Sequence, residues 1–341
     1  MKSKFIPEIL ADSFSHLYQH KMTTSSGGNI SMKDNEGRIW ISPSARDKGY
    51  LNANDFIPVC EDGSCPGKQN VSMETPFHLA LYKAYPDIKA VCHIHPVNFV
   101  ALSLLNELEP EPILAKYNLG FARYAMPGTE QLGDYITEAF LEDPRAVLMQ
   151  NHGIIAIGDN VIELVDELID LNNEIGTSFK LSTIDFESKQ IEREETIFFY
   201  KERVKHYIKV NEEPRFTAES SHFEYQLKVN LSSLLELKSL NIEFNSLIIP
   251  ESYIILKDWI KKEDEYNSTL YEEYCLELSE NSPLLIFKDG NVIIGGHSYY
   301  QIYDILEVLD FTANVLLRSV KMGKINLLNK TQIEELRSVF Y

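Results

Sequence analysis

The sequence predicts an α/β protein in which short strands alternate with amphipathic helices. Apolar residues at helical spacing between residues 161 and 179 indicate a long helix, and shorter helices are expected at 8–20 and 75–85. Short segments bounded by Gly, Asp or Asn, among them residues 90–95, indicate strands. The chain has 341 residues, of which 44% are hydrophobic, so it is long enough for two domains with cores of their own.

The other elements expected in the first half complete one βα-rich domain. A helix is expected after the strand 90–95 and through Leu105. Further strands are expected at 27–31, 38–42, 56–59, 146–150 and 154–157.

Composition limits the partners of this chain. Its formal net charge is −19, whereas DNA, RNA and anionic membranes are bound by basic surfaces, so neither nucleic acid nor membrane is expected as a partner. No apolar run approaches the roughly 18 residues of a membrane-spanning helix, and the first residues lack the apolar core of a secretion signal. Four cysteines are few for this length, and reduced thiols are expected, although Cys60 and Cys65 could approach each other. We therefore expect a cytoplasmic protein.

Two histidines, His93 and His95, stand two residues apart in the expected strand 90–95. Side chains at this spacing point to the same face of a strand, so both imidazoles can converge on one point. His152, in an expected turn, and Glu74, at an expected helix start, would complete a set of three imidazoles and one carboxylate. That set suits Zn²⁺ or another divalent transition metal. Taken singly, each residue also has a structural interpretation, for example Glu74 as an acid that complements a helix dipole.

Taken together and in their order, the motifs around these residues resemble the class II aldolase/adducin family. The resemblance extends from about residue 7 to about residue 180. The motifs that carry it are Gly27-Gly28-Asn29-Ile30-Ser31, Ile41-Ser42-Pro43-Ser44, Ser72-Met73-Glu74-Thr75-Pro76-Phe77-His78, Ala90-Val91-Cys92-His93-Ile94-His95-Pro96, Pro127-Gly128-Thr129 and Gln150-Asn151-His152-Gly153.

The resemblance implies an α/β/α sandwich with a mixed, largely antiparallel sheet, in a homo-oligomer that is a tetramer with fourfold symmetry. It implies that His93, His95 and His152 bind zinc and that Glu74 is both a metal ligand and the acid/base. The implied activity is that of a lyase, which cleaves a small sugar, expected to be phosphorylated, by retro-aldol through a metal-stabilised enediolate. Two alternatives remain: a sugar-phosphate epimerase, dehydratase or decarboxylase that uses the same site, and a non-catalytic scaffold like adducin.

The resemblance also implies a substrate or phosphate site at Gly28, Asn29, Ser44 and Ser72. A glycine pair lets backbone N–H groups approach an anion, and hydroxyls at a helix start add donors. The chain departs from the aldolase pattern at Ala45, where Gly is usual, and at Met73, where many aldolases have Ser. Lys48 could compensate for the lost donor or could be a solvated loop lysine.

The second half is expected to repeat part of the first. Residues 283–295 resemble residues 145–158 at an offset of 137, which aligns Gly290 with Gly153 (290 − 153 = 137). At this offset Asp289 stands in place of His152, and Asn230 and Ser232 in place of His93 and His95. Chance similarity of a common strand–turn–strand–helix unit is the alternative. We expect a catalytic domain at 1–208, a polar linker at 209–222, and at 223–341 a smaller α/β domain, a candidate degenerate copy without metal.

Overall fold

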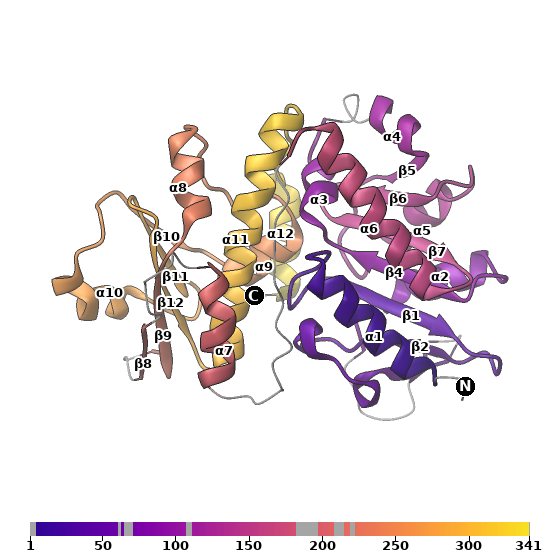
Figure 1. Ribbon diagram of the computed structural model, residues 1–341, viewed down its shortest axis with the longest axis horizontal. Coiled ribbons are helices and arrows are strands. Elements are labelled where there is room, and N and C mark those ends of the chain that lie inside the picture. Colours follow the sequence, from indigo (N-terminus) through magenta and orange to yellow (C-terminus); the bar gives the residue numbers. More distant parts are fainter. Residues whose placement is uncertain are drawn as a thin grey trace. The chain divides into compact units, whose positions relative to one another are not determined.

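The structure is a computed structural model that describes residues 5–60, 63–64, 71–106, 111–181, 197–207, 215–218 and 222–340. It divides into two compact units (Figure 1): unit 1 comprises residues 1–187 and 318–341, and unit 2 comprises residues 188–317. This division differs from the predicted boundaries, because residues 318–341 belong to unit 1 rather than to the second domain. The predicted linker also contains a strand, β8 (Arg215–Ala218). Strand β8 lies at the edge of its sheet, where one side of the strand faces no neighbouring strand, and a polar sequence is compatible with that position.

Unit 1 contains a seven-stranded sheet in the order β3-β2-β1-β4-β7-β6-β5. Every neighbouring pair is antiparallel except β5 and β6, which are parallel. The mixed, largely antiparallel sheet is therefore confirmed. The strands are β1 (Asn29–Lys33), β2 (Ile39–Ile41), β3 (Ile57–Val59), β4 (Ala90–Ile94), β5 (Leu119–Ala122), β6 (Ala146–Met149) and β7 (Gly153–Gly158).

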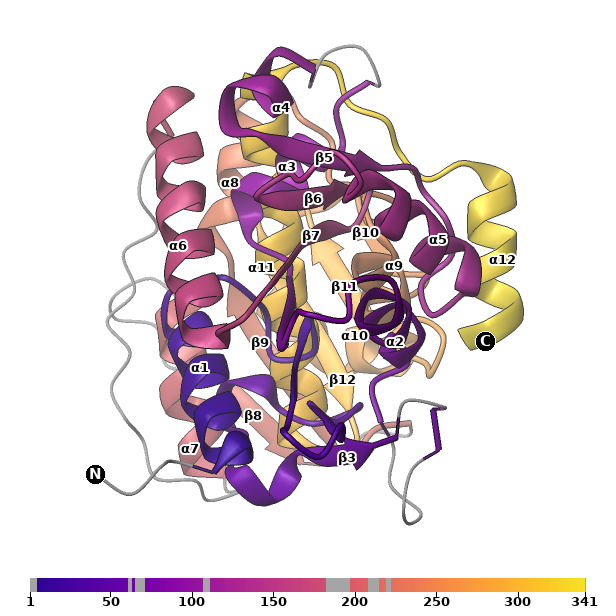
Figure 2. The same cartoon turned by 90° about the vertical axis from the view of Figure 1, so that its right-hand side faces the viewer.

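Helices cover both faces of this sheet, which gives the predicted α/β/α layers (Figures 1 and 2). The long helix α6 (Val161–Ser178) lies beside α1 (Ile6–Gln19), and both pack on one face together with α3 (Val97–Ser103). The opposite face is covered by α2 (Thr75–Ala84) and α5 (Glu130–Ala139). Since β4 is central, all five of its residues are buried, as expected for a strand covered on both sides. The remaining helices of unit 1 are α4 (Glu111–Tyr117) and α12 (Lys330–Phe340).

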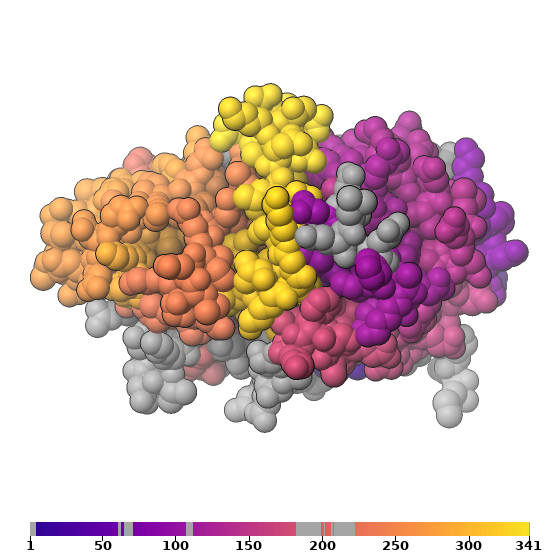
Figure 3. All heavy atoms as spheres, turned by 90° about the horizontal axis from the view of Figure 1, so that it is seen from above, coloured from indigo at the N-terminus to yellow at the C-terminus, as the bar shows by residue number. Residues whose placement is uncertain are grey.

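The last residues of the chain pack against the same unit as the first. Leu105 and Ile325 form an antiparallel bridge, and Asn326 N donates to the carbonyl of Leu104 at 2.6 Å. The yellow C-terminal residues accordingly lie against purple residues of unit 1 in the space-filling view (Figure 3). None of the described helices is long and apolar enough to cross a membrane.

Unit 2 repeats the topology of unit 1. Its sheet has the order β10-β11-β12-β9-β8, with β10 and β11 parallel and every other pair antiparallel. The five strands β5-β6-β7-β4-β1 of unit 1 have the same order and the same directions. The helices recur too, since the run from β4 to α6 and the run from β9 to α11 contain the same succession of strands and helices. The elements are α7 (Ile197–Val204), β8, β9 (Tyr225–Asn230), α8 (Ser232–Ser239), α9 (Pro250–Leu256), β10 (Ile260–Lys262), α10 (Tyr271–Glu277), β11 (Leu284–Phe287), β12 (Asn291–Gly296) and α11 (Tyr299–Met322), which from Arg318 onward belongs to unit 1.

The register of this repeat differs from the predicted offset by one residue at the turn between β11 and β12 and by two residues in β9. In unit 1, His152 N bonds to Met149 O, and in unit 2, Gly290 N bonds to Phe287 O, so Gly290 corresponds to His152 (290 − 152 = 138). Ile155 pairs with His93, and its counterpart Ile293 pairs with Lys228. The residues in the places of His93, His95 and His152 are therefore Lys228, Asn230 and Gly290, instead of Asn230, Ser232 and Asp289. Aligning the glycines was misleading, because no single offset relates the two units: it is 138 (290 − 152) at the turn and 135 (228 − 93) in β9.

Candidate metal centre

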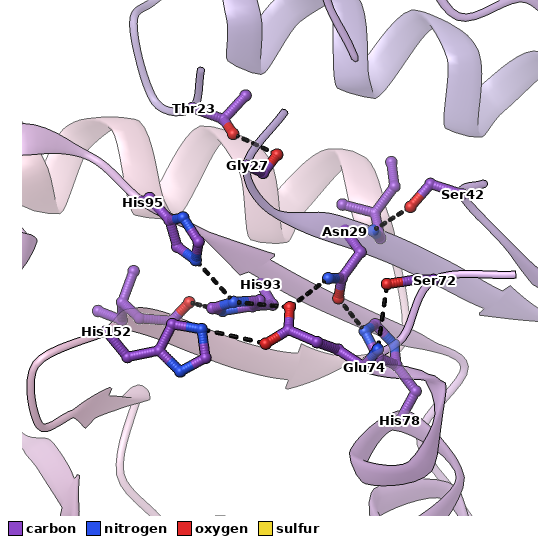
Figure 4. Close-up of polar contacts among 12 residues, drawn as sticks. Thr23, Gly27, Asn29, Ser42, Ser72, Glu74, His78, His93, His95 and His152 are labelled. Atoms are coloured by element: carbon purple, nitrogen blue, oxygen red, sulfur yellow. Dashed lines mark hydrogen bonds and ion pairs between the residues drawn. The ribbon is translucent and has the colours of Figure 1, made fainter. Parts of the chain in front are cut away.

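The structure brings His93, His95 and His152 together (Figure 4). One nitrogen of each imidazole lies within 4.8 Å of the others. Nε2 of His95 is 2.9 Å from Nε2 of His93. All three side chains are buried, and among the described residues this is the group of His, Cys, Asp and Glu side chains that could hold a metal ion.

Two neighbouring elements place these histidines. His93 lies in β4 opposite Ile155, on the face that α2 and α5 cover, and His95 follows directly after the strand. His152 ends the turn between β6 and β7, after Asn151 in the left-handed region at φ 50°. Gly153 is required at the start of β7, because a Cβ there would lie 2.6 Å from Cδ2 of His95. A residue with a side chain at this position would push that imidazole away.

Glu74, the residue before α2, completes the cluster. Its Oε2 lies 3.3 Å from Nε2 of His93, and its Oε1 lies 3.0 Å from Nε2 of His152. Burial acts to raise the pKa of Glu74, but the adjacent His93 and His152 hold it well below its usual value. Glu74 is therefore an ionised carboxylate at neutral pH.

The first contact of His93 beyond the cluster fixes which nitrogen faces the centre. Nδ1 of His93 is 3.0 Å from the carbonyl oxygen of Ile154, which can only accept, so Nδ1 carries the proton. Burial lowers the pKa of His93 to about 4, so this imidazole is neutral and its Nε2 keeps a lone pair. Such an outer hydrogen bond is the usual way in which proteins orient a metal-binding imidazole.

The donor set fits a divalent metal ion. Oε1 of Glu74 is buried with no hydrogen bond assigned to it, and Nε2 of His152 lies 3.0 Å away as an ion-pair partner. Burying a carboxylate next to three imidazoles is costly unless a positive charge balances it. Three nitrogens and one carboxylate oxygen are ligands that zinc and related transition metals accept in tetrahedral sites.

A chain of buried hydrogen bonds, which the sequence did not reveal, holds Glu74 from behind. Nδ2 of Asn29 donates to Oε2 of Glu74 at 2.6 Å, and Nε2 of His78 lies 2.5 Å from Oδ1 of Asn29. Ser31 Oγ is 2.7 Å from Nδ1 of His78 and 3.0 Å from the hydroxyl of Tyr82. Burial and the neighbouring His93 lower the pKa of His78 to about 3, so it is neutral and can donate at one nitrogen while it accepts at the other. His78 belongs to the motif at residues 72–78, but nothing in its spacing signals this role.

The four residues predicted to bind substrate or phosphate have different surroundings. The side chain of Asn29 contacts Glu74 and His78, whereas Ser72 Oγ accepts from Glu74 N at 3.3 Å. Gly28 lies in the left-handed region, and a Cβ there would be 2.8 Å from the carbonyl oxygen of His93. Ser44 is half-buried next to Ala45, whose φ of 52° explains why glycine suits that position. Their role in substrate binding stays a prediction.

Lys48 is buried rather than a solvated loop lysine. Its Nζ donates to the carbonyl oxygen of Pro43, and only 3% of the residue is exposed. Burial lowers its pKa to about 8, and the charges of Glu74 and Asp47 oppose that shift. A partly desolvated cation therefore stands beside the candidate centre.

Two further residues lie outside the cluster. Tyr117 is buried, with its hydroxyl 2.5 Å from Ser178 Oγ, so it has a structural role. Cys60 is an exposed free thiol, and Cys65 lies outside the described residues.

Comparison with known proteins places this geometry in a family. Residues 8–175 match the model of the class II aldolase and adducin N-terminal domain. This part of the chain is a class II aldolase/adducin domain. The residues of the candidate centre all lie within the matched range.

Relatives of this class II aldolase/adducin domain carry two kinds of name. A 3-oxo-tetronate 4-phosphate decarboxylase from Haemophilus influenzae is 27% identical over 173 residues, which cover 48% of this chain and 82% of the relative. An L-fuculose phosphate aldolase from Methanocaldococcus jannaschii is 28% identical over 151 residues, which cover 43% and 81%. A solved L-fuculose 1-phosphate aldolase is 28% identical with a TM-score of 0.46, covering 55% of this chain and 93% of that one.

Proposed function

We propose that this protein is a metal-dependent lyase that cleaves a small, phosphorylated sugar by retro-aldol reaction. The observation that supports this most is the buried cluster of His93, His95 and His152 with the ionised carboxylate of Glu74 against it. A scaffold needs no such cluster, because clustered imidazoles and a carboxylate are costly to bury without a cation. The scaffold alternative is therefore less well supported than an enzyme.

Each part of the cluster has a task in this reaction. A divalent ion, when bound, would offset the negative charge that develops on substrate oxygens. Glu74 accepts the proton of the substrate hydroxyl whose carbon becomes the aldehyde product. The bond between this carbon and its neighbour breaks, and its electron pair stays with the other fragment. Glu74 then returns the proton to the carbon of that fragment, so one carboxylate acts first as base and then as acid.

The hydrogen-bond chain behind Glu74 supports this role. Asn29 donates to Oε2 of Glu74 and holds this oxygen in place. The carboxylate would therefore keep its position when the substrate displaces it from the metal ion. Oε1, which has no hydrogen bond, is the oxygen available to move the proton. Lys48 supplies a nearby positive charge for a phosphorylated substrate.

Decarboxylation of a 3-oxo acid sugar phosphate is the second candidate, and the name of the Haemophilus influenzae relative favours it. Loss of carbon dioxide needs the same stabilisation of negative charge on oxygen, but no base has to remove a hydroxyl proton first. The two reactions therefore differ in their dependence on Glu74 and in the product released.

Zinc is the ion that we propose, and the family resemblance suggests a homo-oligomer, a tetramer. The small number of cysteines favours a cytoplasmic location. Elemental analysis identifies the ion, and light scattering on the purified protein gives the mass of the assembly. Activity with manganese or cobalt but none with zinc would contradict zinc as the working metal.

One experiment tests the proposed function. Wild-type protein, purified without chelators, is analysed for metal and incubated with phosphorylated sugars and 3-oxo acid sugar phosphates, while aldehyde and carbon dioxide are both measured. The expected result is about one metal ion per chain and aldehyde release. His93→Ala should lose both the bound metal and the aldehyde release. His297→Ala, an exposed control outside unit 1, should keep both.

The other outcomes are equally informative. Carbon dioxide without aldehyde would favour the decarboxylase. Full activity of His93→Ala with unchanged metal content would exclude the cluster as the site. Failure to bind zinc, manganese or cobalt would support the scaffold.

A further inference from the structure

Unit 2 contains a cavity of about 420 Å³. Its walls are the end of α8, the strands β10 and β11, and the segments that follow α8 and precede β10 (Figure 1). All of its lining residues belong to unit 2, so it is separate from the candidate metal centre. Small-molecule sites usually have volumes of roughly 300–1,000 Å³, and this cavity falls within that range.

Two aromatic rings form one wall of the cavity. The rings of Phe244 and Trp259 meet edge to face, with centroids 5.1 Å apart and planes at 75°. Nε1 of Trp259 donates to Oγ of Ser246 at 3.2 Å, and Ser246 is itself buried. The only polar atom of the indole is therefore already bonded within the protein. The part of the indole that remains for a ligand is therefore apolar.

The charges around the cavity have the opposite sign to the chain as a whole. Four lysines and two glutamates line it, in a chain whose net charge is −19. Lys261 pairs with Glu243 and Glu263, both at 3.2 Å. Lys262 pairs with Glu277.

Two of the four lysines, Lys238 and Lys288, are left to act on a ligand. Neither forms an ion pair with any residue in the described part of the chain. They come from different elements, Lys238 from the last turn of α8 and Lys288 from the residue after β11. Two unpaired ammonium groups at one cavity attract an anion, and phosphate is a frequent partner of lysine in such sites.

We propose that unit 2 binds a small anion that carries a flat aromatic ring, of the class of the nucleoside monophosphates. Lys238 and Lys288 hold the phosphate, and the base lies against Trp259. A ligand with an aromatic ring suits this cavity better than a sugar phosphate without one, because hydroxyl groups need several hydrogen-bond partners and Asn241 is the only uncharged polar side chain among the lining residues. The hydroxyls of a ribose are therefore expected to face the solvent.

The test measures binding to the full-length chain. The chain has two tryptophans, so in Trp40→Phe protein Trp259 is the only tryptophan left to report by fluorescence. AMP, adenosine, phenyl phosphate and inorganic phosphate are titrated into this variant, and the affinities are repeated by calorimetry. We expect AMP and phenyl phosphate to quench the fluorescence of Trp259. Adenosine and inorganic phosphate should each bind at least tenfold more weakly than AMP.

Variants then test the residues. Lys238→Ala with Lys288→Ala should weaken AMP binding at least tenfold, while Lys257→Ala, whose Nζ bonds to Glu280 O outside the cavity, should leave it unchanged. Circular dichroism checks that each variant is folded. The proposal would be overturned if neither AMP nor phenyl phosphate bound, or if inorganic phosphate bound as tightly as AMP. Unchanged AMP binding in the lysine double variant would also overturn it. Because the readout is binding in unit 2, the result does not depend on the activity proposed for unit 1.

Discussion

At the scale of single residues, the candidate centre depends on opposing effects on one carboxylate. Burial would keep Glu74 protonated, and the two imidazoles beside it reverse that preference. Asn29, predicted to bind substrate, has its side chain on this carboxylate and so connects it to the buried His78. The arrangement fixes the position of Glu74 through Oε2 and leaves Oε1 next to His152 without a hydrogen bond.

Glu74→Gln should separate metal binding from proton transfer. The amide keeps the size of the side chain but cannot take up a proton, so we expect metal content to stay within twofold and the retro-aldol rate to fall about 10²–10⁴-fold. Elemental analysis and steady-state kinetics on the same sample measure both. An unchanged rate would show that Glu74 is not the acid/base.

Lys48 should make the use of a phosphorylated substrate sensitive to pH. Its pKa of about 8 is below the usual value, so its charge is present below pH 8 and is lost as pH rises through this value. We expect the ratio of kcat/KM for a phosphorylated substrate to that for its unphosphorylated analogue to fall over this interval. The ratio cancels titrations that affect both substrates, and the phosphate itself is already fully ionised above its second pKa of about 6. Lys48→Met should abolish the pH dependence; a ratio that falls equally in this variant would exclude Lys48 as its origin.

At the scale of elements, the turn between β6 and β7 depends on residues far away in the sequence. Asn151, next to His152, donates from Nδ2 to the carbonyl oxygen of Asn326 at 2.9 Å, and its own N–H bonds to Ser103 O. Arg318 Nη1 bonds to Oδ1 of Asn98 on α3 at 2.6 Å. The C-terminal residues thus support the turn that carries one histidine of the cluster.

Two substitutions of Asn151 should separate the effect of its backbone conformation on metal binding from the effect of its hydrogen bond to Asn326. Asn151→Gly keeps the left-handed conformation at low cost but loses the bond to Asn326, whereas Asn151→Ala loses the bond and also disfavours φ 50°. We expect both variants to bind metal more weakly, and Asn151→Ala to be the weaker of the two. Competition with a chromophoric chelator gives the metal affinities. Equal, wild-type affinities in both would show that the turn needs no support from residue 326.

At the scale of the whole molecule, one topology is used twice with different chemistry. Unit 2 has the strand order of unit 1 without counterparts of β2, β3 and α2 among its described residues, and Glu74 stands directly before α2. Lys228, Asn230 and Gly290 occupy the places of the three histidines. We infer that metal binding stabilises unit 1 alone.

Metal removal should therefore change thermal unfolding selectively. A ligand at 100 times its Kd stabilises the folded state by about 2.7 kcal/mol, so EDTA should lower the unfolding transition of the wild type. His93→Ala should already unfold at the lower temperature and show no further shift with EDTA. Calorimetry with each purified protein tests this, and an equal shift in the variant would mean that the metal binds elsewhere.

The sequence alone determined the family, the layered α/β fold of the first half and the identity of the residues that meet at the centre. It could do so because strand periodicity places His93 and His95 on one face, and because the motifs that contain Glu74 and His152 occur in the order of the family. The sequence left β5 and α5 unassigned. It also gave the wrong alignment of unit 2 with unit 1, since a register depends on which strand lies opposite.

Only the tertiary structure decided what surrounds these residues. Asn29 and Glu74 are 45 positions apart, and Asn151 and Asn326 are 175 apart, so no local pattern could join them. The burial of Lys48 likewise follows from how the loop that contains it packs. From the sequence alone, a lysine in a loop is expected to be exposed to solvent. Local sequence fixes the direction of a side chain within its element, and tertiary packing decides which other elements it contacts.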